Sequence, residues 1–377
     1  MKIRMNGSEW FATRAGGLNR YFDSLYGALL QQQDVQVEAL AFGVPPADGG
    51  TWGPVGKSTL SRVVRSRARQ PHAATDIIDT HFALYGSRFA RSPKGAVRVH
   101  HFQGPWAAES AVAGAGWLSQ QMKYAVERFI YSRVDHFIVL SNRFAELLSS
   151  TYRIDPEKIS VIPPGVDLDR FNSVDLISQP AQHRAVCVRR LERRMGIDVL
   201  LRAWSQVIVQ TPDAVLEIVG SGTYEDELKD LAVAMRLGTS VIFSGRLSDA
   251  KLREAYARAS VSVVPSLALE GFGLIALESL AAGTPTIVTD CGGLPDAVSG
   301  LDSSLIVPRN DADALSRRIT LALSGERPSR EECIEHAKLF SWERAAQTHL
   351  NLYRILISRP RVSGRRSSRG FGRAPHS

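Results

Sequence analysis

The chain contains, from residue 265 to residue 278, the stretch Pro265-Ser266-Leu267-Ala268-Leu269-Glu270-Gly271-Phe272-Gly273-Leu274-Ile275-Ala276-Leu277-Glu278. A strand-length apolar run, 261–265, leads into it, and its second half has the composition of a helix. Its glycines allow backbone N–H groups to approach an anion at the start of that helix, where the helix dipole favours negative charge. The stretch therefore predicts a strand–turn–helix unit suited to a phosphate group, and a purely structural turn is the alternative.

Strand-length apolar runs alternate with amphipathic stretches on both sides of this unit, which is typical of parallel α/β sheets. At 377 residues the chain is longer than one hydrophobic core usually supports. We expect strands at 35–42, 77–81, 97–101, 136–140, 185–188, 214–220, 241–245, 261–265, 286–289 and 304–307. The sequence thus predicts Rossmann-like domains over 1–170 and 171–340, a helix over 341–358 and a disordered basic tail over 359–377.

Composition excludes several classes of protein. No window approaches the roughly 20 apolar residues that cross a bilayer, and no secretory signal is evident, so we expect a cytoplasmic protein. Cys187, Cys291 and Cys333 have neither zinc-ligand nor disulfide-framework spacing. Of the net charge of +8, the arginines after residue 358 supply six charges. The folded body is therefore nearly neutral, and we expect no nucleic-acid partner.

Further motifs accompany the stretch at 265–278. Glu270 and Glu278 stand on either side of seven residues, and Ala-Ala-Gly-Thr-Pro at 281–285 and Gly-Gly-Leu-Pro-Asp at 292–296 follow. The other matching segments are 16–21, 162–167, 186–191, 218–222, 243–247 and 340–342. With these motifs, residues 1 to about 356 resemble the family-4 retaining glycosyltransferases of the GT-B type.

The resemblance implies two Rossmann-like domains that face each other across a cleft, with the C-terminal helix crossing back to the N-terminal domain. It implies transfer of a hexose from a UDP- or GDP-linked sugar to a glycan, lipid-linked or small-molecule acceptor, without a metal and without a cofactor besides this co-substrate. Arg190 is implied to bind the diphosphate, Glu270 the transferred sugar and Glu278 the ribose hydroxyls. Guanidinium groups can neutralise the leaving diphosphate.

One position departs from the family pattern. The family usually has a Lys five residues after the Arg, whereas this chain has Met195 there. A thioether cannot neutralise a phosphate group. Arg194 or Arg193 is therefore expected to reach the same oxygens, with solvated loop charges as the alternative.

A histidine near the donor sugar is also implied by the resemblance. His101, at the end of an expected strand, matches best, and His100 is the alternative. The remaining substrate-binding residues expected from the matching motifs are Gly16, Gly17, Gly220, Arg246, Gly271, Phe272, Gly273 and Leu274. Other functions compatible with the fold are a catalytically weak nucleotide-sugar-binding protein and a GT-B phosphorylase or epimerase.

Two basic segments suggest a membrane partner. The segment 57–70 and the tail carry many Arg residues and no acid, which suggests peripheral association with anionic lipid at the inner membrane face. The alternative is solvated charge, which the lack of a strong apolar face in the segment favours slightly. The run 53–59 looks like a phosphate loop, but Thr51 stands where its first glycine is required. We therefore do not expect a nucleoside triphosphatase.

Overall fold

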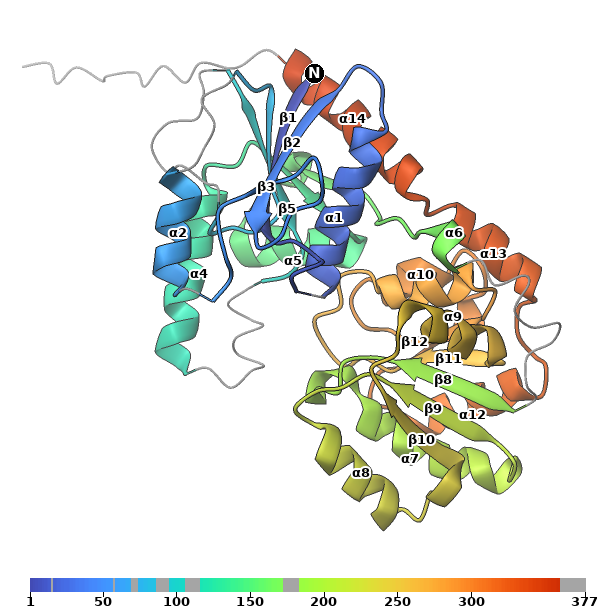
Figure 1. The fold of residues 1–377 in the computed structure, drawn as a ribbon. Helices are drawn as coiled ribbons and strands as arrows, with labels where there is room; N and C mark the ends of the chain where they lie inside the picture. The colour runs from blue at the N-terminus through green and yellow to red at the C-terminus, as the bar shows by residue number, and fades with distance from the viewer. Residues whose placement is uncertain are drawn as a thin grey trace, which may run out of the picture.

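The computed structural model describes residues 1–14, 16–56, 58–68, 74–85, 95–105, 116–171 and 183–359. These residues form two α/β domains, each built on a sheet whose neighbouring strands run parallel (Figure 1). The predicted fold class is confirmed. The linker expected near 172–183 and the tail after residue 359 lie almost entirely outside the described residues, as does Lys57 of the run that looked like a phosphate loop.

The first sheet has the strand order β3-β2-β1-β4-β5-β6-β7. Its strands are β1 (Lys2–Glu9), β2 (Gln36–Phe42), β3 (Gly50–Thr51), β4 (Ile77–Thr80), β5 (Val97–Phe102), β6 (His136–Val139) and β7 (Ile159–Val161). Its helices are α1 (Gly17–Leu30), α2 (Thr59–Ala68), α4 (Trp117–Tyr131) and α5 (Asn142–Tyr152). Because β6 is buried along its whole length, the residues after His136 form an apolar run.

The second sheet has the strand order β10-β9-β8-β11-β12-β13. Its strands are β8 (Arg184–Val188), β9 (Val215–Val219), β10 (Val241–Gly245), β11 (Val261–Val264), β12 (Thr286–Thr289) and β13 (Ile306–Val307). The helices around it are α6 (Leu168–Phe171), α7 (Ile197–Gln210), α8 (Glu225–Ala234), α9 (Asp249–Arg258), α10 (Leu274–Ala281), α11 (Leu294–Val298), α12 (Ala312–Leu323) and α13 (Arg330–Lys338). Side chains cap several of them, as Asp311 does at the start of α12.

The terminal helix α14 (Trp342–Ser358) returns to the first domain and lies along α1 (Figure 1). Ser341 caps it by accepting a hydrogen bond from the Arg344 N–H, as a Ser before a helical pattern predicts. The chain at Val166 pairs with this start, because the Val166 N–H donates to the Phe340 carbonyl. A Cβ on Gly165 would lie 2.5 Å from the Trp342 backbone, so only glycine fits there. The expected return of the last helix is confirmed.

Most predicted strands match within two residues, and β10 and β12 match fully. The prediction omitted β1, which pairs with β2 and β4 in the middle of the first sheet. Arg4 and Asn6 interrupt its apolar pattern, although both are buried and Arg4 donates to Glu38. All strands of the first sheet precede residue 170 in the chain, and all strands of the second sheet follow it. Helix α6, however, packs on α10 of the second domain.

Candidate active site

Three backbone segments meet in close contact where β8, β9 and β11 end. A Cβ on Gly220, after β9, would lie 1.8 Å from the Arg189 carbonyl oxygen. A Cβ on Gly196 would lie 2.0 Å from the Pro265 oxygen, and both glycines have positive φ angles. Such contacts require glycine, and they hold the loops together at the carboxyl edge of the sheet, where α/β domains bind ligands.

Arg189, directly after β8, brings a buried positive charge to this edge. Its side chain is 5% exposed and forms an ion pair with Glu270. The same guanidinium contacts the Ser266 hydroxyl, and its Nη2 lies 2.9 Å from the Met195 sulfur. Its Nε has no hydrogen-bond acceptor among the described residues. Arg189 thus occupies the space beside Met195, where the family has a lysine.

Arg190, the predicted diphosphate ligand, has an exposed side chain. Because it follows Arg189 at the end of β8, the two guanidinium groups leave the same turn, one toward the partly buried Glu270 and one toward solvent. The sequence motifs predicted a role for Arg190 and none for Arg189. The sequence did contain one signal for Arg189, because it is a charged residue that directly follows an otherwise apolar strand.

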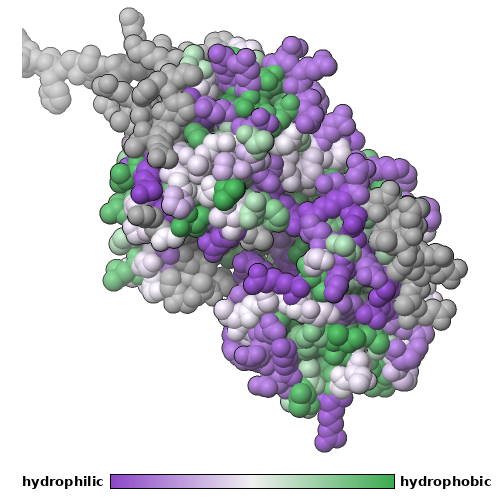
Figure 2. All heavy atoms as spheres, in the orientation of Figure 1, coloured by the Kyte–Doolittle hydropathy of each residue, from purple (hydrophilic) through white to green (hydrophobic). Residues whose placement is uncertain are grey.

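Glu270 connects this charged edge with a cavity between the domains. The cavity has a volume of about 380 Å³, and the surface is hollowed between the domains (Figure 2). Arg143, Phe144 and Leu147 of α5 line it from the first domain, and Glu270 and Gly292 line it from the second. Glu270 is therefore placed between a buried cation and a space large enough for a sugar ring.

The loop from Glu270 to Gly273 is held by the backbone of 292–293. Gly293 N–H donates to the Glu270 carbonyl at 3.0 Å, and a Cβ on Gly293 would lie 2.2 Å from the Gly271 oxygen. Gly273 has φ +89° at the start of α10, which no side chain caps. The α10 N-terminus thus offers backbone N–H donors, as the sequence predicts. Phe272 is buried against Phe340, so only its backbone faces this region.

Three further arginines named by the sequence analysis, Arg193, Arg194 and Arg246, have different environments. Arg193 pairs with Glu227 of α8 and lies over the Tyr224 ring. Arg194 Nη1 donates to the Leu269 carbonyl at 3.2 Å, so Arg194 supports the loop that carries Glu270. Of the two replacements expected for the missing lysine, Arg194 therefore lies nearer the site. Arg246 is exposed, and its Nε donates to Ser221 Oγ at 2.9 Å, beside the Gly220 turn.

Glu278 is buried on α10 and pairs with Arg20 of the first domain. Arg20 Nη1 lies 2.8 Å from Glu278 Oε1, and the side chains are 22% and 9% exposed. Burial raises the pKa of the Glu278 carboxyl, while the nearby charges of Arg20 and Arg170 lower it. The pair fixes the α1 end of the first domain against α10. The sequence motifs identified Glu278 but not its partner, because the contact joins residues 258 positions apart.

Gly16 and Gly17 lie at the start of α1, close in sequence to Arg20. Both are exposed, and a Cβ on either would meet no atom within 4 Å. Packing therefore explains Gly220 and Gly293 but not these two. Open space in front of Gly16 and Gly17 fits the expectation that a ligand approaches their backbone.

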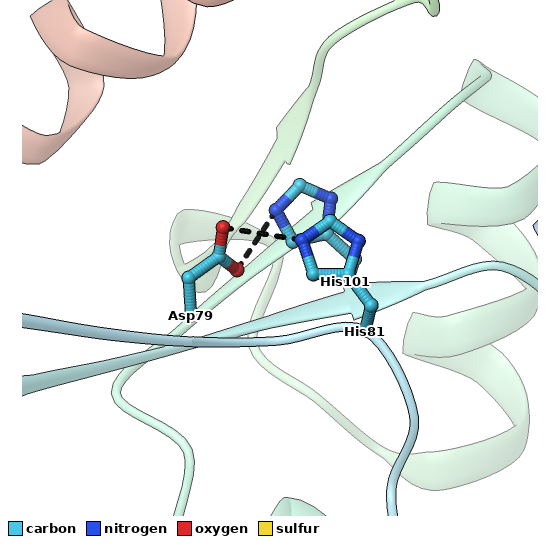
Figure 3. A group of neighbouring side chains, drawn as sticks. All are labelled: Asp79, His81 and His101. Atoms are coloured by element: carbon cyan, nitrogen blue, oxygen red, sulfur yellow. Dashed lines mark hydrogen bonds and ion pairs between the residues drawn. The ribbon is translucent and has the colours of Figure 1, made fainter. Parts of the chain in front are cut away.

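His101 lies in a buried polar cluster under α14. Its Nε2 is 3.0 Å from Asp79 Oδ1, its Nδ1 is 3.2 Å from the Tyr21 hydroxyl, and its ring stacks on His81 (Figure 3). Burial lowers the pKa of His101 to about 4, although Asp79 opposes the shift. The side chain is fully enclosed and does not line the cavity beside Glu270. The structure therefore does not bring His101 together with the other predicted site residues.

Asp79 is the centre of this cluster. Burial would raise the pKa of its carboxyl, but His101 and His81 lower it well below the usual range. The Tyr353 hydroxyl of α14 also donates to it, at 2.8 Å. Asp79, His81 and His101 have ligand atoms within 4.8 Å of one another, as a metal site requires, but their contacts are those of a hydrogen-bonded network that attaches α14. His100, the alternative candidate, packs against Tyr131 and is also buried.

Comparisons with known proteins agree with this architecture. The family model described as Glycosyltransferase Family 4 matches residues 15–170, and the model described as Glycosyl transferases group 1 matches residues 172–340. The D-inositol 3-phosphate glycosyltransferase of Actinosynnema mirum is 31% identical over 314 residues, which are 77% of this chain and 75% of that protein. The corresponding protein of Mycobacteroides abscessus is 31% identical over 331 residues, covering 83% and 73%.

Solved structures show the same fold. Sucrose-phosphate synthase from Thermosynechococcus elongatus superposes with a TM-score of 0.76 and 26% identity, covering 94% of this chain and 99% of that one. Anabaena HepE in complex with UDP superposes with a TM-score of 0.71 and 16% identity, covering 94% and 100%. The two facing α/β domains thus define a GT-B glycosyltransferase. The chain belongs to glycosyltransferase family 4, whose members are of the retaining type.

Membrane-spanning helices require both length and apolarity. None of the helices in the described ranges has the length and apolarity needed to cross a bilayer.

Proposed function

We propose that this chain transfers a hexose from a nucleoside-diphosphate sugar to a hydroxyl group of its acceptor, with the diphosphate at the carboxyl ends of β8, β9 and β11. The observation that carries the proposal is the Arg189–Glu270 ion pair at that edge, between the α10 N-terminus and the cavity between the domains. A buried cation and backbone N–H donors are what a departing diphosphate requires. Glu278 takes the ribose hydroxyls, because a carboxylate accepts hydrogen bonds from both.

The charges suggest how donor binding prepares the site. Glu270 neutralises Arg189, so the two groups satisfy each other. A diphosphate carries more negative charge and competes for the guanidinium, with Arg190 adding a second cation from the same turn. Glu270 is then free to accept hydrogen bonds from the sugar hydroxyls at the cavity wall. Two arginines and a helix N-terminus would supply the positive charge without a metal.

The reaction exchanges one bond for another at the anomeric carbon. The bond to the phosphate oxygen breaks, and its electron pair stays on the diphosphate. The acceptor oxygen bonds to the same face of the carbon, and its proton passes to the leaving phosphate. In this scheme the residues of the chain hold the diphosphate, orient the sugar and stabilise the developing charge.

Relatives guide the choice of substrates to test. The curated relatives are named for D-inositol 3-phosphate, and solved structures of this fold contain UDP or UDP-glucose. We therefore place a uridine-linked hexose first among donors and a phosphorylated polyol first among acceptors. Glycan and lipid-linked acceptors come next.

The test is release of nucleoside diphosphate from UDP- and GDP-hexoses with a panel of hydroxyl acceptors, in the presence of EDTA. The proposal expects acceptor-dependent release that EDTA leaves unchanged, and a product with retained anomeric configuration by NMR. Glu270→Gln should reduce turnover by roughly two orders of magnitude, as is typical when a group that contacts the reacting sugar is removed. Phosphate-dependent sugar release, product formation without an acceptor, or turnover only with a divalent cation would contradict it.

A further inference from the structure

Helix α4 exposes apolar side chains on the face turned to solvent. Leu118, Met122, Ala125 and Phe129 are spaced four, three and four residues apart, which places them in one stripe along the helix. Leu118 and Met122 are 72% and 71% exposed, and Phe129 is 48% exposed. An apolar stripe of this length on a surface helix indicates an interaction surface.

Helix α4 packs on the core through its opposite face, so the exposed apolar stripe is not the face that it buries. Ile130 and Tyr131 fill the core beneath the helix, and Glu127 is buried there as well. The hydroxyl groups of Tyr131 and Tyr152 donate to the Glu127 carboxylate, at 3.4 and 2.7 Å. The buried carboxylate is thus satisfied and fixes the orientation of the helix. This orientation keeps the apolar stripe facing outward.

Helix α2 adds a second exposed apolar pair on the same face of the first sheet. Leu60 and Val64, one turn apart, are 74% and 58% exposed. Val63 of α2 packs against the core cluster that contains Ile130 and Tyr131 of α4. Figure 1 shows both helices on the left side of the first domain, and Figure 2 shows hydrophobic side chains along that edge. We refer to the exposed residues Leu60, Val64, Leu118, Met122 and Phe129 as the α2/α4 surface.

The charges that α2 and α4 present to solvent are all positive. Helix α2 contains Arg62, Arg65 and Arg67 and no acid, and the only acid in α4 is the buried Glu127. Arg62 pairs with Glu9 in the interior, whereas Arg128 is exposed and Arg65 is partly exposed. Apolar side chains flanked by cations, without exposed acids, are the chemistry that binds the surface of an anionic bilayer.

We propose that the α2/α4 surface docks the first domain on an anionic lipid bilayer, with the apolar side chains in the interface and the arginines against lipid phosphates. A second copy of the chain would bring two basic faces together, which opposes association. The inference does not depend on the proposed sugar transfer, because it rests on a different surface. It also differs from binding by the basic tail, which is electrostatic only.

The test is co-sedimentation of the full chain with vesicles of phosphatidylcholine, with or without phosphatidylglycerol, at low and high salt. Wild type should bind the anionic vesicles and bind less at high salt. The double variant Leu118→Glu/Met122→Glu should lose at least about tenfold in vesicle affinity, because it places charge in the apolar interface. Arg65→Gln/Arg128→Gln should lose about fivefold for each arginine, from roughly 1 kcal/mol per charge.

A matched control uses exposed apolar residues of the second domain. Val209 and Val233 are 79% and 77% exposed, and Val209→Glu/Val233→Glu should bind vesicles like wild type. The variants change residues that are exposed or, for Arg65, partly exposed, so their thermal unfolding should match wild type. Full binding by Leu118→Glu/Met122→Glu would overturn the proposal and assign binding to another segment. No binding of wild type, or light scattering that shows a dimer broken by this variant, would also overturn it.

Discussion

The guanidinium of Arg20 donates a hydrogen bond of 2.8 Å to Glu278, and this bond connects α1 of the first domain with α10 of the second. The Glu278 side chain is nearly buried. The carboxylate that we assign to the ribose therefore already has a positively charged partner in Arg20. The domains therefore meet through the same carboxylate that the donor is proposed to contact.

Removal of Arg20 should make nucleotide binding sensitive to pH. Burial raises the pKa of Glu278 and Arg20 lowers it, so Arg20→Met should raise it further. The protonated carboxyl group accepts fewer hydrogen bonds, and UDP affinity should fall as pH decreases, by up to about tenfold per pH unit below that pKa. Calorimetric titrations over a range of pH measure this, with Arg202→Met on α7 as a control. Affinity of Arg20→Met that follows the wild-type pH profile would contradict the assignment of Glu278.

Arg189 should be important for catalysis, although the sequence motifs assign it no role. Arg189→Ala removes the buried cation and leaves Glu270 without its partner, so kcat/KM should fall by roughly 100- to 1000-fold. Because Met195 Sδ lies 2.9 Å from the guanidinium, a lysine at 195 would place its ammonium in the vacated space. Arg189→Ala/Met195→Lys should therefore recover at least about tenfold of that loss.

Controls for the Arg189 experiment come from the neighbouring loop. Arg193 pairs with Glu227 on α8, and Arg193→Ala should retain near wild-type kcat/KM. Thermal unfolding of each variant separates lost catalysis from lost folding. No effect of Arg189→Ala, or no recovery with Met195→Lys in a folded double variant, would show that this guanidinium does not serve the donor site.

Substitution of the site glycines by alanine should have two different effects, one on stability and one on binding. A Cβ on Gly293 would lie 2.2 Å from the Gly271 oxygen and 2.6 Å from Ser141 Cβ, so Gly293→Ala should destabilise the chain by about 1–3 kcal/mol. Gly17→Ala meets open space, and it should keep the wild-type unfolding midpoint while weakening nucleotide-sugar binding. Denaturant unfolding and donor titration measure the two effects. Equal effects on stability would disprove this distinction.

The buried histidines should make folding sensitive to acid. Burial lowers the pKa of His101 and of His349 to about 4, whereas an unfolded histidine titrates near 6.5. Between these values the unfolded chain binds more protons, so stability should fall as pH decreases through this window. Each such histidine contributes about 1.4 kcal/mol per pH unit. His349→Phe should therefore reduce the slope of unfolding free energy against pH, and an unchanged slope would show that this histidine does not cause the acid sensitivity.

Sequence patterns predicted the second domain well for a physical reason. Its central strands, such as β11 and β12, are buried along their whole length and read as short runs rich in Val, Ile and Thr, residues that favour strands. The strand β1 was missed because Arg4 and Asn6 are buried through contacts that only the folded sheet supplies. Local periodicity contains no information about such partners.

The parts of the site that are formed by the backbone could be predicted from the sequence. The loop at 270–273 and the glycines around it follow from turn geometry, and the structure holds them as a strand–turn–helix unit. The roles of Arg189 and Arg20 depend on contacts across 81 and 258 residues, which no local motif encodes. His101 lies at a strand end as predicted, but α14 covers it. A return helix that supplies polar partners cannot be read from the strand alone.

The donor site is tested most sharply by calorimetric titration of UDP and GDP, in the presence of EDTA, into wild type and Glu278→Ala. We expect one site that binds one of the two nucleotides without a metal. We also expect at least about a tenfold loss of affinity in Glu278→Ala, from the loss of hydrogen bonds to a charged group. Equal affinity in a folded variant, or no binding of either nucleotide to wild type, would contradict a donor site that includes Glu278.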